Sequence, residues 1–315
     1  MPVNLHVGMD HDHYDWSPLN QKRPALRWPD QARVALCVIV NLEHMEWRPP
    51  EGHFQSPNLA GGYGPAPFPD VTRWSHREYG HRVGIFRLMD MLHTYGIKVT
   101  VAMDALTAEH YPYLVRYCLS RGCEMIAHGV SVSRVITSNM TEQDERAYLQ
   151  TSVDALTRAT GVAPLGWLGP EYGESTRTPQ LLAQVGIRYV CDWVNDEQPY
   201  PLKTPQGDLL ALPITLPLDD VNALWDRRVP IRRYAEMLKD SFDTLYQDGA
   251  ENGRLLTLNF HPWLMGQPFR IRYLHDAIGY IMRQPGVWTA TGTEIIEWYR
   301  QHPPGVGNEF ASVPG

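Results

Sequence analysis

The chain has 315 residues, a formal net charge of −7 and a sequence pI near 6.0. That length suits one large α/β barrel or two ordinary domains, and it allows a sizeable buried core. The acidic balance and the lack of a basic block argue against nucleic-acid and anionic-membrane partners. The sequence also contains no apolar stretch of roughly 18 residues, which a membrane span would require.

The N-terminus and the cysteines predict the compartment. The first residues are polar and acidic, unlike a signal peptide, and the four cysteines lack CxxC spacing. These features favour a cytoplasmic protein whose thiols are reduced and mostly buried.

Residues 1–32 show few periodic signals and contain the polar-aromatic cluster DHDHYDW at residues 10–16. A solvated tail is one interpretation of this segment. The aromatic residues favour another, an N-terminal extension that packs over the mouth of a barrel, where His11 and His13 would contact the substrate. The His-x-His spacing would also suit metal chelation if the segment were extended.

The first predicted strand ends in a group of polar residues. The apolar run VALCVIV at residues 34–40 predicts a strand that is buried on both faces, as in a parallel sheet. Asn41, Glu43 and His44 follow it directly. Because side chains converge on ligands at the carboxyl ends of parallel strands, these three are candidate site residues.

The rest of the chain alternates between strands and helices after a Pro- and Gly-rich loop over 47–76. The predicted strands cover residues 99–103, 123–127, 165–168, 189–191, 209–218 and 255–260. The predicted helices cover residues 82–95, 107–122, 141–161, 178–186, 231–245, 271–283 and 293–299. About seven repeats of β then α predict a single α/β barrel with its site at the carboxyl rim.

Nearly every predicted strand ends in an imidazole, a carboxylate or an amide. These residues are Asn41, Glu43, His44, Asp104, His128, Glu171, Asp192, Asp196, Asp219, Asp220 and His261. Such groups suit general acid–base catalysis or a Zn²⁺-type metal. GxSxG, GxGxxG and GxxxxGK motifs are all missing, so neither a serine hydrolase nor a nucleotide-binding protein is indicated.

Six segments together resemble the polysaccharide-deacetylase (NodB-homology) superfamily, and within it the allantoinase-like branch. They are NLEH, SHREYGHRVGIFRLMDML, EMIAHG, GWLGPE, CDWVNDEQPYP and LNFHPWLMGQP, and the resemblance runs from about residue 28 to residue 299. The fold that it implies is a distorted (β/α)7 barrel, which agrees with the α/β repeats. We therefore expect one barrel domain over 33–302 and a C-terminal tail over 303–315. The resemblance also implies a homo-oligomer.

The resemblance carries over to the site only in part. Metal-dependent members have two aspartates where this chain has Asn41 and Glu43, and their second metal histidine falls on Val132. His128 matches the first metal histidine, and His261 matches the family's final general acid. The usual base is missing, and the cofactor is either none or a single divalent metal such as Zn²⁺ on Glu43 and His128. The allantoinase-like branch resembles this chain in both departures, and its members open cyclic amides or imides.

The leading hypothesis is a hydrolase of carbon–nitrogen bonds that acts on a small amide, ureide or cyclic imide. Glu43 would position water or bind substrate N–H groups, His128 would bind or polarise the carbonyl, and His261 would be the acid–base group. The other predicted substrate-binding residues are Asn41, His44, Trp167, Glu171, Asp192, Trp193, Asp196, Trp263, His11 and His13. Two alternatives are a metal-dependent N-deacetylase of an acetylated sugar or polysaccharide and a catalytically silent barrel that binds a small ligand or a protein.

Overall fold

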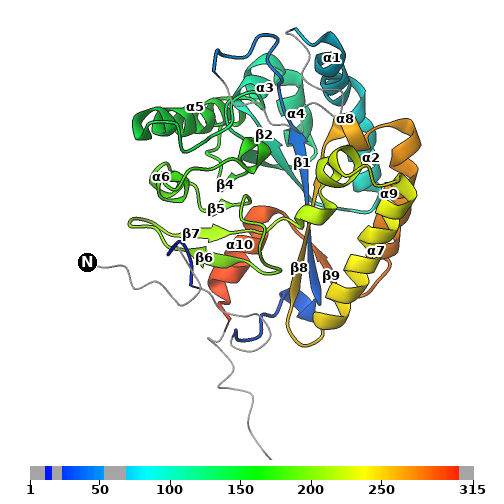
Figure 1. Cartoon of the computed structure of the whole chain (residues 1–315). Helices are drawn as coiled ribbons and strands as arrows, with labels where there is room; N and C mark the ends of the chain where they lie inside the picture. Colours follow the sequence, from blue (N-terminus) through cyan, green and yellow to red (C-terminus); the bar gives the residue numbers. More distant parts are fainter. Residues whose placement is uncertain (1–10, 16–22, 53–68, 305–315) are drawn as a thin grey trace, which may run out of the picture.

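Strand β1 (Val34–Leu42) pairs with β2, β8 and β9 in a curled sheet of the computed structural model, which describes residues 11–15, 23–52 and 69–304 (Figure 1). The parallel strands follow the order β7, β5, β4, β3, β2, β1 and β8; β6 is antiparallel to β7, and β9 runs parallel to β1. Their bounds are β2 Val99–Met103, β3 Glu124–Ala127, β4 Gly166–Trp167, β5 Tyr189–Val190, β6 Tyr200–Leu202, β7 Leu209–Ala211, β8 Arg254–Phe260 and β9 Val287–Thr289. This sheet has the predicted architecture, a distorted α/β barrel.

The two faces of β1 have different neighbours. Val38 and Val40 pack with the apolar residues of the surrounding helices, whereas Cys37 and Ile39 belong to the cluster inside the barrel. Because successive side chains of a strand point to opposite faces, the odd-numbered positions continue inward past the apolar run. Glu43 therefore faces the barrel interior at its mouth.

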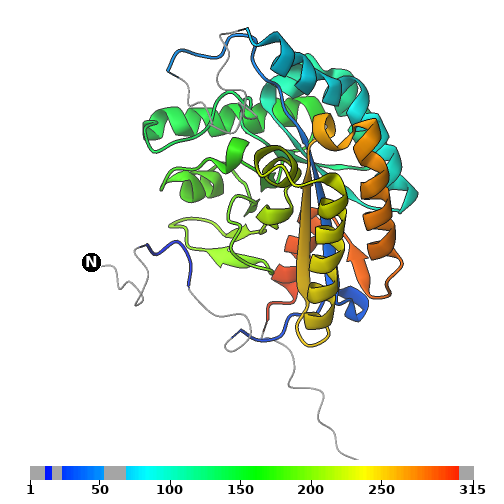
Figure 2. The same ribbon diagram turned by 45° about the vertical axis from the view of Figure 1, so that its right-hand side comes forward.

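The helices cover the outer face of the sheet, and α7 and α9 lie side by side with α7 against β8 (Figure 2). The helices are α1 Val71–Tyr79, α2 Ile85–Thr94, α3 Ala105–His110, α4 Pro112–Ser120, α5 Glu142–Thr160, α6 Thr178–Gln184, α7 Ile231–Asp248, α8 Pro262–Met265, α9 Pro268–Met282 and α10 Gly292–Gln301. Within the described ranges, no helix combines the length and the hydropathy that crossing a bilayer demands.

Residues 24–32 close the end of the barrel opposite the mouth, which corrects the prediction that this part of the extension packs over the mouth. The Trp28 indole donates a hydrogen bond to the carbonyl of Arg254 at 2.8 Å, and the Gly253 N–H donates to the carbonyl of Leu26 at 2.9 Å. Arg254 is the first residue of β8, so these contacts lie at the amino ends of the strands. Trp28 is 1% exposed, because its ring fills this end of the barrel.

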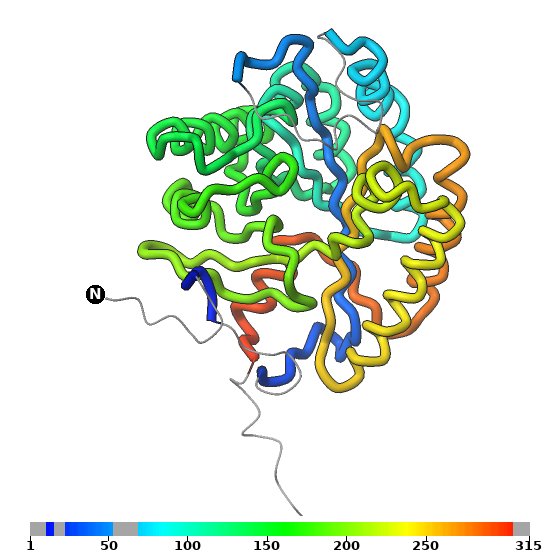
Figure 3. The backbone as a smooth tube through the Cα atoms, in the orientation of Figure 1, coloured from blue at the N-terminus to red at the C-terminus, as the bar shows by residue number. Residues whose placement is uncertain are grey.

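Residues 11–15 lie beside the edge strand β6 (Figure 3). The carbonyl of His13 accepts a hydrogen bond from the Lys203 N–H at 2.6 Å, one residue past that strand. The other residues of the predicted extension, 1–10 and 16–22, and most of the predicted tail, 305–315, lie outside the described residues.

In the part of the chain that the structure describes, loop residues join the two edges of the sheet by backbone hydrogen bonds, without direct pairing of the edge strands. The Leu255 N–H of β8 donates to the carbonyl of Glu197 at 2.8 Å, and the Thr215 N–H donates to the carbonyl of Thr257 at 3.2 Å. The predicted strand over 209–218 is therefore too long, since β7 ends at Ala211. Two prolines follow in LPITLP, and because proline lacks an N–H group it interrupts strand pairing.

Two predicted helical boundaries are also wrong. The predicted loop over 47–76 includes the start of α1, where the side chain of Asp70 caps the helix by accepting from the Arg73 N–H at 3.0 Å. The single helix predicted over 107–122 consists of α3 and α4. Pro112 starts the second helix, because its ring fixes the backbone at a first helical position and cannot continue the preceding one.

Candidate active site

A cavity of about 310 Å³ opens at the carboxyl ends of the strands. A cavity of this volume suits a small ligand. The predicted site residues that line it are Asn41, Glu43, His128, Glu171, Asp192 and His261. Segments more than two hundred residues apart in the sequence thus meet in one cavity, as predicted.

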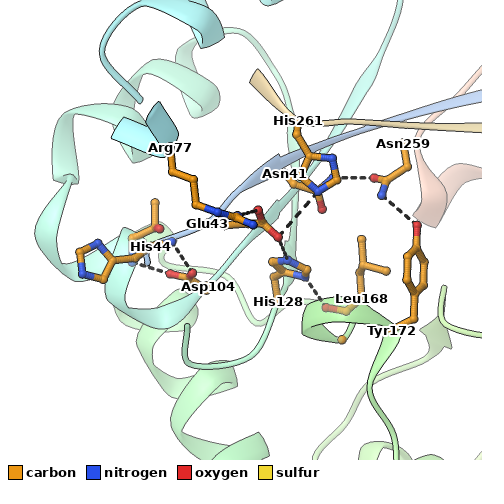
Figure 4. A network of polar contacts seen from close by, with 12 residues as sticks. Asn41, Glu43, His44, Arg77, Asp104, His128, Leu168, Tyr172, Asn259 and His261 are labelled. Atoms are coloured by element: carbon orange, nitrogen blue, oxygen red, sulfur yellow. Dashed lines mark hydrogen bonds and ion pairs between the residues drawn. The ribbon is translucent and has the colours of Figure 1, made fainter. Parts of the chain in front are cut away.

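The Glu43 carboxylate lies among three nitrogen-bearing side chains (Figure 4). Its Oε2 accepts a hydrogen bond from Nη1 of Arg77 at 2.7 Å. Its Oε1 lies 3.1 Å from Nε2 of His128 and 3.7 Å from Nε2 of His261. Burial opposes ionisation, but these three neighbours hold the pKa of Glu43 well below its usual range. Glu43 is therefore a fixed anion, and a weak base at neutral pH.

His261 is oriented by a buried aspartate. Its Nδ1 lies 2.6 Å from Oδ1 of Asp220, and its backbone N–H donates to Oδ2 of the same carboxylate at 2.8 Å. Burial alone would lower the pKa of His261, but the charges of Asp220 and Glu43 outweigh it and raise the pKa well above its usual value. Nε2 faces the cavity with Glu43 beyond hydrogen-bond distance, so this nitrogen is free to exchange a proton with a ligand.

Both ring nitrogens of His128 have partners. Nδ1 lies 2.5 Å from the carbonyl of Leu168, so it carries the donated proton, and Nε2 lies 3.1 Å from Glu43. Burial opposes the charged form, but the hydrogen bond and the charge of Glu43 raise the pKa of His128. His128 therefore acts first of all to hold Glu43 in place.

Arg77 is a cavity residue that the predicted site did not include. It lies on α1 and is 8% exposed, and its guanidinium carbon lies 5.1 Å from the ring centre of Trp263. The π-helical segment Gly80–Gly84 after α1 packs closely on the segment that follows β8, since a Cβ on Gly84 would lie 2.1 Å from the carbonyl oxygen of Pro262. This close approach carries Arg77 to the mouth of the barrel. Arg77 lies in SHREYGHRVG, part of one of the six segments that resemble the superfamily. The loop predicted over 47–76 covers most of α1, so the sequence did not place Arg77 on a helix beside the site.

A chain of amides and carboxylates lies beside Glu43. The Asn41 amide donates to Oδ1 of Asn259 at 2.6 Å, and Asn259 donates to Oδ2 of Asp219 at 2.7 Å. Tyr172 donates to the same oxygen at 2.8 Å. Oδ1 of Asn41 has no hydrogen-bond partner among the described residues, so it is left to accept from a ligand. Asn259 could have been found from the sequence, because it precedes His261 by two positions and shares its face of β8.

Asp192 supports the strained turn that follows β4. Its Oδ1 accepts a hydrogen bond from the Gly169 N–H at 2.7 Å. Glu171 and Tyr172 follow shortly after Gly169 and have positive φ angles of 54° and 55°, which are strained for residues other than glycine. Burial raises the pKa of Asp192 to about 7, although the Gly169 N–H opposes the shift. Burial and the neighbouring Asp192 also raise the pKa of Glu174 well above its usual value. Two buried carboxyl groups in contact therefore retain a proton between them near neutral pH.

His44 does not reach the cavity, which corrects its predicted role. It follows Glu43 in the extended segment directly after β1, and its side chain points to the opposite side (Figure 4). Its backbone N–H donates to Oδ2 of Asp104 at 2.6 Å, and its ring lies 5.0 Å from that of His110.

Four other predicted residues also lie away from the cavity, near edge strand β6: Trp193, Asp196, His11 and His13. The Trp193 ring packs on both histidines, at centroid distances of 6.2 and 5.4 Å. Asp196 accepts hydrogen bonds from both terminal nitrogens of Arg23 at 2.9 and 2.7 Å. The loop after β5 turns towards the edge of the sheet. The prediction that this loop contributes Trp193 and Asp196 to the substrate site is therefore wrong.

The other two tryptophans do not wall the cavity as predicted. Trp167 is fully buried in the core, with its ring 6.5 Å from that of Tyr148. Trp263 lies behind Arg77, and its ring centre is 6.1 Å from that of His261. Trp263 thus supports the cationic side chains without lining the cavity itself.

The donor set does not fit the predicted Zn²⁺ site. Glu43 already accepts from two cationic side chains, and the position of the missing second histidine is Val132, which is 1% exposed. A divalent cation on Glu43 would lie against the guanidinium of Arg77 and would be repelled by it. In the described part of the chain, one trio has ligand atoms within 4.8 Å of one another, namely Asp219, Asp220 and His261. Both aspartates already accept hydrogen bonds from neighbouring groups.

Comparison with known proteins agrees with the fold. Residues 78–190 match the polysaccharide deacetylase family. A Schizosaccharomyces pombe protein that carries a polysaccharide deacetylase name is 27% identical over 301 residues, which cover 88% of this chain and 93% of the relative. A peptidoglycan deacetylase of Helicobacter pylori is 24% identical over 277 residues, covering 78% and 92% of the two chains.

A crystal structure of PuuE allantoinase superposes with a TM-score of 0.81 at 26% identity, covering 95% of this chain and 99% of the other. These matches agree with the predicted resemblance to the superfamily, and the relatives are named as deacetylases and an allantoinase, in line with the predicted enzyme class. The predicted cytoplasmic location and homo-oligomer stay predictions.

Proposed function

From its relationship to the polysaccharide deacetylases, we propose that this chain hydrolyses a carbon–nitrogen bond in a small amide, ureide or cyclic imide. The observation that carries the proposal is the cavity of about 310 Å³, which is lined by His261. Asp220 holds Nδ1 of this histidine, so Nε2 is the nitrogen that remains for a ligand. That volume accommodates a small heterocycle, whereas a polymer needs an open groove on either side of the reacting bond.

His261 would move the one proton that hydrolysis requires. In its neutral form Nε2 takes a proton from water while the water oxygen forms a bond to the carbonyl carbon. The same proton then passes to the leaving nitrogen as the carbon–nitrogen bond breaks. Asp220 holds the ring in the tautomer that leaves Nε2 towards the cavity.

One acceptor for a substrate N–H group belongs to a residue that lines the cavity, Asn41. Oδ1 of Asn41 lacks a partner among the described residues, and this side chain is 2% exposed. An unpartnered buried acceptor favours a ligand that donates a hydrogen bond there, because leaving it unpaired costs free energy. Ureides and cyclic imides carry such N–H groups next to the carbonyl that is attacked. The allantoinase that superposes over almost the whole chain supports the same class.

The second candidate is an N-deacetylase of an acetylated sugar or polysaccharide. The names of the two sequence relatives favour it, since both refer to deacetylation of polymers. The cationic surroundings of Glu43 do not suit the metal that such a reaction would use here. A catalytically silent barrel is the third candidate, and the intact pairing of His261 with Asp220 favours an enzyme over it.

A substrate panel distinguishes the three candidates. We would incubate the purified chain with allantoin, hydantoin, dihydrouracil, N-acetylglucosamine, chitin oligomers and peptidoglycan, and follow ring opening and acetate release separately. Ring opening of a small ureide or imide is the expected result. Acetate release from the sugars or polymers alone would replace the proposal with the second candidate, and no turnover of any compound would favour the third.

A further inference from the structure

We propose that Arg77 stabilises the negative charge that develops on the substrate's carbonyl oxygen, the task that a divalent cation has in a metal-dependent hydrolase. This inference rests on the proposed function, and it assigns a catalytic residue on α1, an element outside the strand ends where the site was predicted.

The first argument concerns the donors of Arg77 that remain available. Its guanidinium lines the cavity, and the side chain is 8% exposed. Among the described residues its one hydrogen-bond partner is Oε2 of Glu43 at 2.7 Å. A guanidinium has five N–H donors, so the others are left for an oxygen acceptor in the cavity. An almost buried cation with spare donors is what an oxyanion would bind.

The second argument concerns the other cationic side chains of the cavity. Both ring nitrogens of His128 are engaged, by Leu168 and by Glu43. Nδ1 of His261 is held by Asp220, which leaves Nε2 for proton transfer. Neither imidazole therefore has a nitrogen to spare for the carbonyl oxygen.

The third argument is that Arg77 is held before any substrate arrives. Glu43 fixes one edge of the guanidinium, and Trp263 lies 5.1 Å from its carbon. The segment Gly80–Gly84 packs against the backbone of Pro262 and Trp263. A Cβ on Gly80 would lie 2.8 Å from the Trp263 backbone nitrogen. Donors that are positioned in advance stabilise developing charge without reorganising during the reaction.

The step is balanced with these residues. Water attacks the carbonyl carbon and gives a proton to Nε2 of His261, while the π-electron pair moves onto the carbonyl oxygen and is stabilised by Arg77. The carbonyl then re-forms, the carbon–nitrogen bond breaks, and the nitrogen takes the proton back from His261. Glu43 stays ionised throughout and neutralises Arg77.

The test measures kcat and KM of Arg77→Ala and Arg77→Lys on the panel compound that the wild-type chain hydrolyses fastest. We expect Arg77→Ala to lose about 10²–10³-fold in kcat with little change in KM, as for removal of an oxyanion donor. Millimolar guanidinium, which is far below a denaturing concentration, should restore part of the lost rate. Arg77→Lys should keep more activity than Arg77→Ala, because it retains the charge.

Arg82→Ala is the matched control. Arg82 lies in the helical segment Gly80–Gly84 that follows α1, is exposed and does not line the cavity. Its loss should leave kcat unchanged. Circular dichroism of every variant identifies misfolding, and rescue by guanidinium separates a catalytic role from a structural one.

Three outcomes would overturn the inference. A rise in KM at constant kcat would show that Arg77 binds a carboxylate of the substrate instead. A folded Arg77→Ala variant with full kcat would remove the catalytic role, as would a loss in kcat of a folded variant that guanidinium does not restore.

If the wild-type chain hydrolyses no compound of the panel, the proposed function fails, and calorimetric binding of methylphosphonate, a tetrahedral oxyanion, still tests Arg77. Weaker binding by Arg77→Ala, with Arg82→Ala unchanged, would support the inference, and equal binding by both would contradict it.

Discussion

The molecule has two clusters of histidines and carboxylates. Residues that are adjacent in the sequence belong to different clusters. The mouth cluster comprises Glu43, Arg77, His128, Asp220 and His261. The outer cluster comprises His44, Glu78, His81, His110 and Tyr111. The segment directly after β1 contributes Glu43 to the first and His44 to the second, while α1 contributes Arg77 and Glu78 in the same way.

The clusters differ in which form of histidine they favour. His261 is buried and faces two carboxylates, so its pKa is raised. Burial and the nearby His110 lower the pKa of His44 to about 4, and its Nδ1 has no hydrogen-bond partner in the described ranges. The same residue type is therefore mostly charged on one side of β1 and neutral on the other, because the position of the carboxylates decides which form is stabilised.

The largest expected effect separates the two clusters by activity. His261→Ala should lower kcat by about 10²–10⁴-fold, because it removes the acid–base group. His44→Ala, at a histidine of the outer cluster, should change kcat by less than about twofold, since the His44 side chain does not line the cavity. Steady-state kinetics and thermal unfolding of both variants check this. Wild-type turnover by a folded His261→Ala variant would contradict the role of His261.

The next effect is on stability. Glu43→Gln leaves buried cations of the mouth cluster without their counter-charge and should lower the free energy of unfolding by about 3–5 kcal/mol at neutral pH. Glu46→Gln is the matched control, because Glu46 pairs with the half-exposed Arg134 at 2.7 Å. That pair should contribute about 0–1 kcal/mol. Urea unfolding measures both, and equal losses would mean that Glu43 does not hold the cluster together.

The third expected effect is a displaced pH profile. Proton transfer begins with neutral His261, so kcat/KM should fall as the pH drops through its raised pKa, at a higher pH than for an ordinary histidine. Asp220→Asn removes one of the two carboxylates that raise this pKa. Its acidic limb should therefore move to lower pH, with a lower plateau because the ring is less well oriented. A limb that stays in place would assign the titration to another group.

The smallest expected effect is that of metal removal. Dialysis against a chelator should leave kcat unchanged, because Arg77 and His128 already neutralise Glu43. Metal analysis before and after dialysis accompanies the assay. Loss of activity that Zn²⁺ restores would favour the metal-dependent N-deacetylase. It would also show that the mouth cluster binds a metal.

The sequence by itself determined which strand-end residues face the cavity on β1 and β8. The apolar runs give each strand its buried length, and the alternation of side chains then carries Glu43 and His261 inward. These features depend on neighbours within one strand, so they can be predicted without coordinates. The order of strands and helices, and hence the barrel, was accessible for the same reason.

Only the tertiary structure decided the partners of those residues. Arg77 reaches Glu43 because α1 packs on the segment after β8, and Asp220 meets His261 because a turn after β7 folds back on β8. The loop after β5 takes Trp193 and Asp196 to the edge of the sheet, although they follow a strand end. Such outcomes depend on packing between distant segments, where sequence spacing carries no information about direction or distance.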